Sequence, residues 1–172
     1  MAVLFTYISA ASYIFLTYYK VSQATFSLLF AINASGMISG SYLNGLFNQK
    51  FHYLKIAQVA SGILLITALI IFIVVLTVPQ VPYLFLVLSI FILLFCVGCI
   101  NPNATAASLV PFTDKTGLAS ALGGALRMGL GAFVAALLGM FHNPSLALIF
   151  GLIVGLALLC NYFLKVTQKK TA

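Results

Sequence analysis

The residue with the clearest chemical potential is Arg127, a single cation near the middle of an uncharged stretch that runs from Thr116 to Phe141. A helix of that length spans a bilayer and places the guanidinium group near the bilayer midplane. A charge at that depth costs roughly 2.5–3.5 kcal/mol on insertion scales, so we expect the side chain to face protein or water rather than lipid. Arg127 is therefore the first candidate for substrate binding or ion coupling.

The chain offers Arg127 no anionic partner within reach. Asp114 is the only acidic residue, and it precedes Arg127 by about 20 Å along a helix. An intramembrane arginine usually contacts an anion, carbonyl groups or water. We therefore expect the anion to come from a substrate, a lipid or another polypeptide. The alternative is a local crevice in which carbonyl groups and water alone solvate the side chain.

Two asparagines flank a proline inside the next informative segment. Pro102 has no N–H group to donate to the carbonyl of Gly98, so we expect the helix to bend there and to leave a backbone acceptor free. Asn101 and Asn103 then either line a cavity, as polar groups beside helix breaks do in transporters, or bond to neighbouring helices. The remaining candidates for a polar lining are Asn33, Tyr7 and Tyr13.

Small residues recur at helical spacing in two other places. Gly36 and Gly40 form a G-x-x-x-G pair, which is typical of close contacts between membrane helices. A second ridge recurs every four residues on the face opposite Arg127, and it consists of Gly117, Ala121, Ala125 and Gly129. We expect both sets to pack closely against neighbouring helices.

The composition determines which elements must hold these residues. Hydrophobic residues make up 63% of the chain and charged residues 5%, which predicts an integral membrane protein. Six apolar segments are each long enough to cross about 30 Å of hydrocarbon as a helix, and none alternates like a barrel strand. We predict an all-α membrane protein in which residues 1–172 form one six-helix domain, with no soluble domain. The segments are Met1–Tyr19, Thr25–Phe47, Ile56–Val78, Tyr83–Val110, Gly117–Phe141 and Ser145–Leu164.

The net charge of +7 reflects topology rather than nucleic-acid binding. With six helices, Lys20 lies alone on one side of the membrane. All other lysines fall on the opposite side, which the positive-inside rule identifies as the cytoplasm. Both termini should then be cytoplasmic. The cytoplasmic lysines are Lys50, Lys55, Lys115, Lys165, Lys169 and Lys170.

The six segments also divide into two similar triplets. In each triplet the first member carries scattered polar groups, the second is rich in small residues and the third is mostly Leu, Ile, Val and Ala. Because three helices reverse the chain direction, we expect an inverted three-plus-three repeat. The alternative is that any six apolar helices can be sorted in this way.

Enzymatic chemistry finds little support. Cys96 and Cys99 form a C-x-x-C pair without histidine or acidic neighbours, so packing is favoured over metal or redox chemistry. Ser35 would need a histidine base for nucleophilic catalysis. His52 and His142 both fall at the ends of the expected helices. We therefore expect no enzyme, no bound metal and no cofactor.

Three runs together resemble the Bcr/CflA drug-resistance transporters of the major facilitator superfamily, over nearly the whole chain. They are Phe30-Ala31-Ile32-Asn33-Ala34 with Gly36, Asn101-Pro102-Asn103-Ala104-Thr105, and Gly117-x-Ala119-Ser120-Ala121 leading to Arg127-Met128-Gly129-Leu130-Gly131. The resemblance is to the second half, helices seven to twelve, of a twelve-helix transporter. It implies proton-driven export of drugs across the bacterial inner membrane, with the main proton-carrying acid in a first half that this chain lacks. The segment Gly40–Lys50 departs from the superfamily's Gly-x4-Asp-Arg pattern, because Asn44 stands where an acid is expected.

The expected function is therefore conditional on an N-terminal six-helix half. With it, the six polar candidates would line a central cavity that takes up small molecules and protons. A helix that starts at the first residue, Met1, is consistent with a chain cut from a longer one. The alternatives are a channel subunit, a self-assembling half and an inactive membrane fragment.

Overall fold

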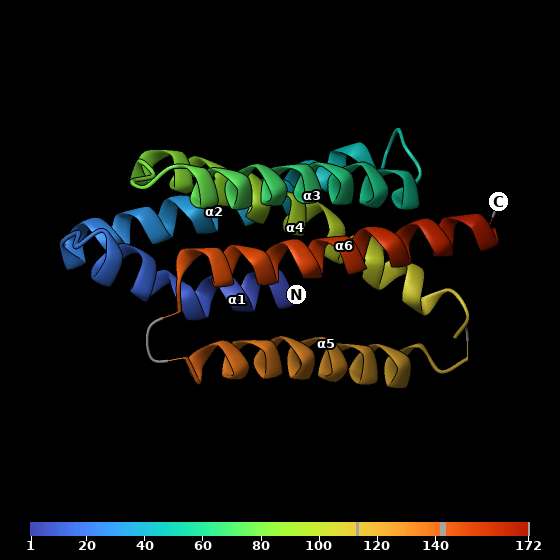
Figure 1. Ribbon diagram of the computed structural model, residues 1–172. Helices are drawn as coiled ribbons and strands as arrows, with labels where there is room; N and C mark the ends of the chain where they lie inside the picture. The colour runs from blue at the N-terminus through green and yellow to red at the C-terminus, as the bar shows by residue number, and fades with distance from the viewer. Residues whose placement is uncertain (113, 142–143, 172) are drawn as a thin grey trace.

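The computed structural model describes residues 1–112, 114–141 and 144–171, with side chains as far as residue 167. The described residues form helices and turns and no strand (Figure 1). The first helix, α1, changes at Tyr13 into a π-helical turn, η1, which ends at Tyr18. The elements are α1 (Ala2–Ser12), η1 (Tyr13–Tyr18), α2 (Gln23–Phe47), α3 (Tyr53–Thr77), α4 (Tyr83–Leu109), α5 (Thr116–Gly139) and α6 (Leu146–Thr171).

The prediction of an all-α protein with six helices is confirmed. Helices α2 to α6 are each long and apolar enough to cross a membrane, and the combined helix Ala2–Tyr18 is apolar but shorter. The largest difference in boundaries is at α6, which continues to Thr171 instead of stopping at Leu164. Hydropathy falls at Lys165, but residues such as lysine and glutamine are good helix formers, so the backbone continues as a helix beyond the apolar run.

The helices contact one another in the pattern of an inverted repeat. Helix α2 packs on α4, and its counterpart α5 packs on α1. Helix α3 packs on α4, and its counterpart α6 packs on α1. The third members of the two triplets, α3 and α6, pack on each other. If α1, α2 and α3 are exchanged with α4, α5 and α6, the same pairs of helices are in contact. The three-plus-three division of the sequence predicted this symmetry.

The turns lie at two opposite ends of the bundle. The α2–α3 turn, the α4–α5 turn and the C-terminal end of α6 are at the right in Figure 1, and the other turns are at the left. At the left-hand end, the Tyr19 hydroxyl donates a hydrogen bond to the Val81 carbonyl at 2.6 Å and so ties two turns together.

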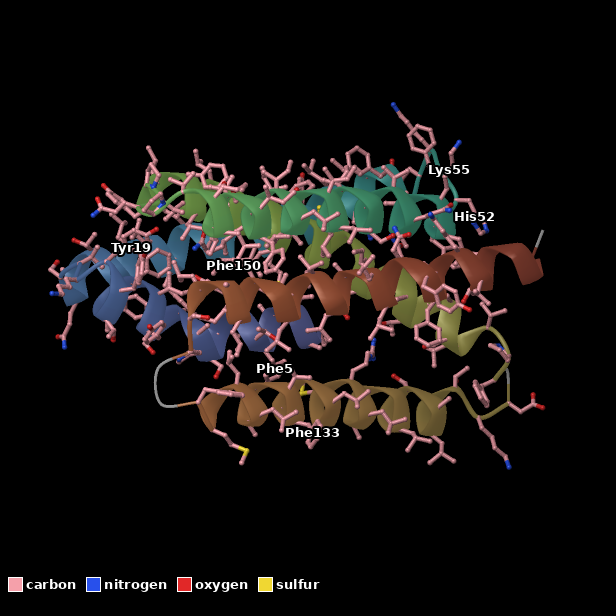
Figure 2. The ribbon with its side chains drawn as sticks, in the orientation of Figure 1. Phe5, Tyr19, His52, Lys55, Phe133 and Phe150 are labelled. Atoms are coloured by element: carbon pink, nitrogen blue, oxygen red, sulfur yellow. The ribbon has the colours of Figure 1, made fainter. Side chains whose placement is uncertain are left out.

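The core is centred on α4, and α5 contributes least to it. Twelve residues of α4 are buried, whereas Gly131 and Leu138 are the buried residues of α5. Figure 2 shows Phe150 of α6 inside the bundle and Phe133 of α5 pointing away from it. Helix α5 therefore lies at the edge of the bundle with most of its surface uncovered by the described chain.

Candidate functional site

Arg127 is bound by neutral groups. Its Nε donates to the carbonyl of Gly123, one turn earlier in α5, at 3.1 Å. One terminal nitrogen donates to the Thr105 hydroxyl of α4, and that hydroxyl donates in turn to the Asn101 carbonyl at 2.7 Å. Neither acceptor of the guanidinium is a carboxylate, so its positive charge is solvated but not neutralised by these contacts.

A small cavity adjoins the guanidinium group. It has a volume of about 210 Å³, and Asn101, Ala104 and Arg127 contribute to its wall together with residues of α1, α3 and α6. The wall is otherwise mainly apolar, with Leu64, Val97 and Leu156 among its residues. The cavity therefore combines one fixed cation and one amide with an apolar wall, an arrangement that small-molecule sites commonly use.

Asn33 and Tyr7 form a second polar pair between α2 and α1. The Asn33 Nδ2 donates to the Tyr7 hydroxyl oxygen at 3.0 Å, and both side chains are buried. The Tyr7 ring also stacks on Phe30, with ring centroids 5.9 Å apart. The Asn33 Oδ1 is buried without a hydrogen-bond partner among the described residues. A buried acceptor without a donor is unusual, so this amide could still bind a water or a ligand donor.

Asn103 points away from Arg127 and into the contact between α4 and α2. Its Nδ2 donates to the Asn44 Oδ1 and, at 2.9 Å, to the Cys99 carbonyl. Its Oδ1 accepts from the Nδ2 atoms of Asn44 and Asn48, at 3.4 and 3.0 Å. The three asparagines thus form an amide cluster that holds two helices together.

Pro102 lies within α4 and leaves the Gly98 carbonyl free, as its chemistry predicted. The Ser41 hydroxyl of α2 donates to that carbonyl at 3.2 Å, so a side chain replaces the missing backbone donor. Helix α4 continues without interruption from Tyr83 to Leu109. The predicted bend at Pro102 stays a prediction.

Within the described chain the six candidates have different surroundings, and the expectation that they line a cavity shared with an N-terminal half stays a prediction. Arg127 and Asn101 share a cavity, Tyr7 and Asn33 pair elsewhere, and Asn103 belongs to the amide cluster. Tyr13 lies in η1 and lines a hollow with the end of α3 and the start of α6. The physical reason is that residues at different positions around one helix face different neighbouring helices. Hydropathy alone does not show how each helix is rotated about its axis.

The glycine sets differ in their surroundings. A Cβ added at Gly36 would lie 2.7 Å from the carbonyl oxygen of Phe91, and one added at Gly40 would overlap that of Phe95. Both residues therefore allow α2 to touch the backbone of α4. The ridge of Gly117, Ala121, Ala125 and Gly129 is exposed, and a Cβ added at either of its glycines would meet no atom within 4 Å. Within the described residues, this ridge has no neighbour.

Four polar side chains were given no role in the sequence interpretation, although Thr105 stood in one of its motifs. Three of them bind groups that the sequence had singled out: Thr105 binds Arg127, Ser41 binds the Gly98 carbonyl and Asn48 binds Asn103. The sequence of one helix does not show which residue of another helix it meets. The fourth is Asn161 of α6, whose Nδ2 donates to the Ser61 hydroxyl of α3 at 3.2 Å. A lone amide in an otherwise apolar run was the available signal for it.

His142 lies outside the described residues. In the part of the chain that the structure covers, no three His, Cys, Asp or Glu side chains gather to hold a metal ion.

Comparisons with known proteins give one relationship. The chain is 34% identical over 143 residues to the uncharacterized MFS-type transporter YdgK of Bacillus subtilis. The aligned residues are 82% of this chain and 35% of that protein, so the chain spans about a third of its relative's length. No protein-family model and no solved structure matches the chain.

The relationship is to a transporter and not to an enzyme, which confirms the expectation that the chain has no enzymatic function. It also accounts for the fold, because an inverted three-plus-three repeat of six helices is half of the major facilitator arrangement. The chain is a membrane-spanning helical protein, distantly homologous to a transporter of the major facilitator superfamily.

Proposed function

We propose that the chain is the C-terminal half of a proton-coupled exporter of drugs or other small molecules in the bacterial inner membrane. The resemblance to Bcr/CflA transporters supports the class of substrate, and the lysine distribution supports cytoplasmic termini. The single observation that carries the proposal is Arg127, a partly buried cation whose contacts are a carbonyl and a hydroxyl.

Arg127 is the coupling residue in this proposal. A cation held near a carboxylate lowers the pKa of that carboxylate and keeps it ionised. The chain's one acid, Asp114, is exposed in the turn before α5, so the carboxylate comes from the first half of the transporter. Protonation of that carboxylate would release Arg127 to its neutral partners Gly123 and Thr105, and the substrate would then move in exchange for the proton.

The first half docks on α5 in this proposal. The relative YdgK is longer than this chain, which is consistent with a missing half. Most of α5 is exposed, and its ridge of Gly117, Ala121, Ala125 and Gly129 offers a surface on which another helix can approach closely. Alternating access needs two such halves that rock around one site, so the chain performs transport only as part of the pair.

Transport by the assembled pair tests the role of Arg127. The chain would be reconstituted with a six-helix half encoded immediately upstream of it, and uptake of the cationic dye ethidium into inside-out vesicles would be followed after a pH gradient is imposed. We expect Arg127→Ala to reduce gradient-driven uptake at least tenfold and Arg127→Lys to restore part of it. Lys165→Ala, an exposed lysine on α6, is the matched control. Full proton-coupled uptake by Arg127→Ala would refute the proposed coupling.

The exposed ridge on α5 also favours a second candidate, a self-assembled form. Two copies that bury this ridge against each other would form a symmetric pair, which could act as a channel. Purified chain that conducts ions without a proton gradient would support that alternative. If the purified chain inserts but neither conducts nor exchanges substrate, and no upstream reading frame encodes a first half, the chain is an inactive fragment.

A further inference from the structure

An apolar groove runs along the outer surface of α3, at the end of the bundle that holds the α2–α3 turn. It has a volume of about 460 Å³ and lies between α2 and α3 with α4 as its floor. Lys55 is its one charged lining residue. The others are aromatic or aliphatic side chains and two thiols, and Phe47, Phe51, Ile63 and Ile92 are among them.

The groove follows from the way the helices pair. Helices α2 and α3 are consecutive, yet each packs principally on α4. Gly36 and Gly40 hold α2 against the carbonyl groups of α4, while Ala57, Ala60 and Leu64 of α3 are buried on the other side. The two helices are thereby held apart with α4 between them. The space left over the middle of α4 is the groove.

The outer wall of the groove has the character of a lipid-facing surface. Along α3, the exposed residues Val59, Ile63, Ile66, Ile70 and Ile73 follow one stripe at helical spacing, and all are large and aliphatic. This surface contrasts with α5, whose exposed face carries the small-residue ridge and where we place the partner half. A stripe of bulky aliphatic side chains suits contact with lipid tails, which impose no close backbone approach.

The length and charge of the groove suit one kind of occupant. From Lys55 to Ile63 the groove follows α3 for about 12 Å, which is close to the depth of one leaflet of a hydrocarbon core about 30 Å thick. Figure 2 shows Lys55 and His52 together at the end of the bundle, at the level of the turns. The Lys55 ammonium makes no hydrogen bond to the described residues, so it is available to an anion at the membrane surface.

We propose that this groove is a binding site for one acyl chain of an anionic phospholipid, whose headgroup, with its net negative charge, pairs with Lys55. The aromatic rings of Phe47 and Phe51 flank the end of the groove that holds the headgroup, and Ile63 and Ile92 contact the chain farther along the groove. The lipid comes from the leaflet on the lysine-rich side of the protein. This site is independent of the Arg127 cavity, which other residues line.

The absence of tryptophan from the sequence permits a direct test. A Phe51→Trp variant carries one fluorescent reporter inside the groove, and brominated acyl chains quench tryptophan when they touch it. The protein would be reconstituted in bilayers that contain brominated phosphatidylglycerol or brominated phosphatidylcholine in a background of unbrominated lipid. Phe47→Trp serves as a second reporter in the same groove if Phe51→Trp does not fold. Phe163→Trp places a reporter on the exposed surface of α6, outside the groove.

We expect the reporter in the groove to prefer the anionic lipid about fivefold, the preference that one lysine near a membrane surface typically gives. The preference should fall as salt is added. Lys55→Gln should remove it at Phe51→Trp and leave the reporter on α6 unchanged. Lys165→Gln, which alters a lysine at the same end of the bundle, should leave the groove reporter unchanged.

Two results would overturn the proposal. One is equal affinity for the two lipids at Phe51→Trp, or a preference that survives Lys55→Gln, because either would remove the role of the lysine. The other is a groove reporter that neither brominated lipid quenches while the reporter on α6 is quenched. That result would mean that protein, such as the partner half or a second copy, covers the groove.

Discussion

Two helix contacts that the inverted repeat makes equivalent are built in different ways. Between α2 and α4, Gly36, Gly40 and Gly98 bring backbone atoms together, since a Cβ added at Gly98 would overlap the Met37 carbonyl oxygen. Between α1 and α5, Gly131 meets the ring of Phe5, which Figure 2 shows between the two helices. A backbone cannot yield without moving a whole helix, whereas a ring can turn.

Polar groups follow the same division. The α2–α4 contact contains the amide cluster of Asn44, Asn48 and Asn103, while the α1–α5 contact contains one hydrogen bond, from the Ser9 hydroxyl to the Ala135 carbonyl at 3.4 Å. Within the six-helix bundle, the first contact therefore acts as a fixed joint. The second leaves α5 free to adjust, and α5 is the helix that carries Arg127.

The largest expected difference between the two contacts is in the loss of stability when a glycine at the contact is replaced by alanine. Gly40→Ala should lower the free energy of unfolding by about 1–3 kcal/mol or more, because the new Cβ overlaps the carbonyl of Phe95. Gly131→Ala should change it by less than about 1 kcal/mol, since the Phe5 ring can shift to a neighbouring rotamer. Unfolding by detergent titration in lipid bicelles, followed by circular dichroism, measures both. Equal losses would show that the two contacts are equally rigid.

The amide cluster should account for the next largest effect. Asn103→Ala removes four hydrogen bonds and leaves the polar atoms of Asn44 and Asn48 without that partner, so we expect a loss of about 1–3 kcal/mol. Asn101→Ala is the matched control, two residues away on the same helix. Its side chain lines the Arg127 cavity and makes no hydrogen bond to the described residues, so its removal should change stability by less than about 0.5 kcal/mol.

The same titration distinguishes the two asparagines. A larger loss for Asn101→Ala than for Asn103→Ala would contradict the assignment of Asn103 to the helix contact. It would mean that the amide beside Arg127 carries the structural role.

The smallest expected difference is in the stability lost when the serine that bridges each contact is replaced by alanine. Ser41 bridges α2 and α4, and Ser9 bridges α1 and α5. Ser41→Ala leaves the Gly98 carbonyl without its donor, because Pro102 supplies no N–H group, and should cost about 0.6–1.7 kcal/mol. Ser9→Ala removes a long hydrogen bond to a carbonyl inside α5, which has its own helical donor, and should cost less than about 0.5 kcal/mol. Replacing Pro102 by Ala together with Ser41→Ala should recover part of the first loss. A Ser41→Ala loss that persists in the Pro102→Ala background would contradict this account.

The sequence was most informative about the elements that lipid itself selects. A chain inside hydrocarbon must satisfy every backbone group internally, so long apolar runs are helices, although a helix can continue past the first polar residue, as α6 does. The repeat could be recognised for the same reason, because each triplet distributes polar and small residues in the same order. Even Pro102 and the freed Gly98 carbonyl were predictable, since they depend on covalent structure alone.

The sequence was least informative about which side chains meet. Asn101 and Asn103 stand two residues apart beside one proline, yet one faces the Arg127 cavity and the other faces α2. The neighbour that each residue meets depends on the rotation of α4 relative to two other helices, which no local pattern contains. The exposed ridge on α5 has the same origin. Its spacing predicted close packing, but among the described residues it meets no neighbour, so this packing stays a prediction.

The π-helical turn η1 gives the first helix a place where one residue can be removed without loss of the helix. A π-turn holds one more residue per turn than an α-helix would, and the bond from the Tyr19 N–H to the Ile14 carbonyl spans five residues. Removing one residue between Tyr13 and Tyr18 would convert the turn to an α-helix while both ends kept their partners, including the Tyr19–Val81 bond that joins the two turns. The π-turn could also shift along the helix. Each residue that it passes would then rotate about the helix axis by about the angle of one residue, and neither end of the helix would unfold. The first helix of the bundle thus ends in a turn that can lose one residue, or shift along the helix, without unfolding.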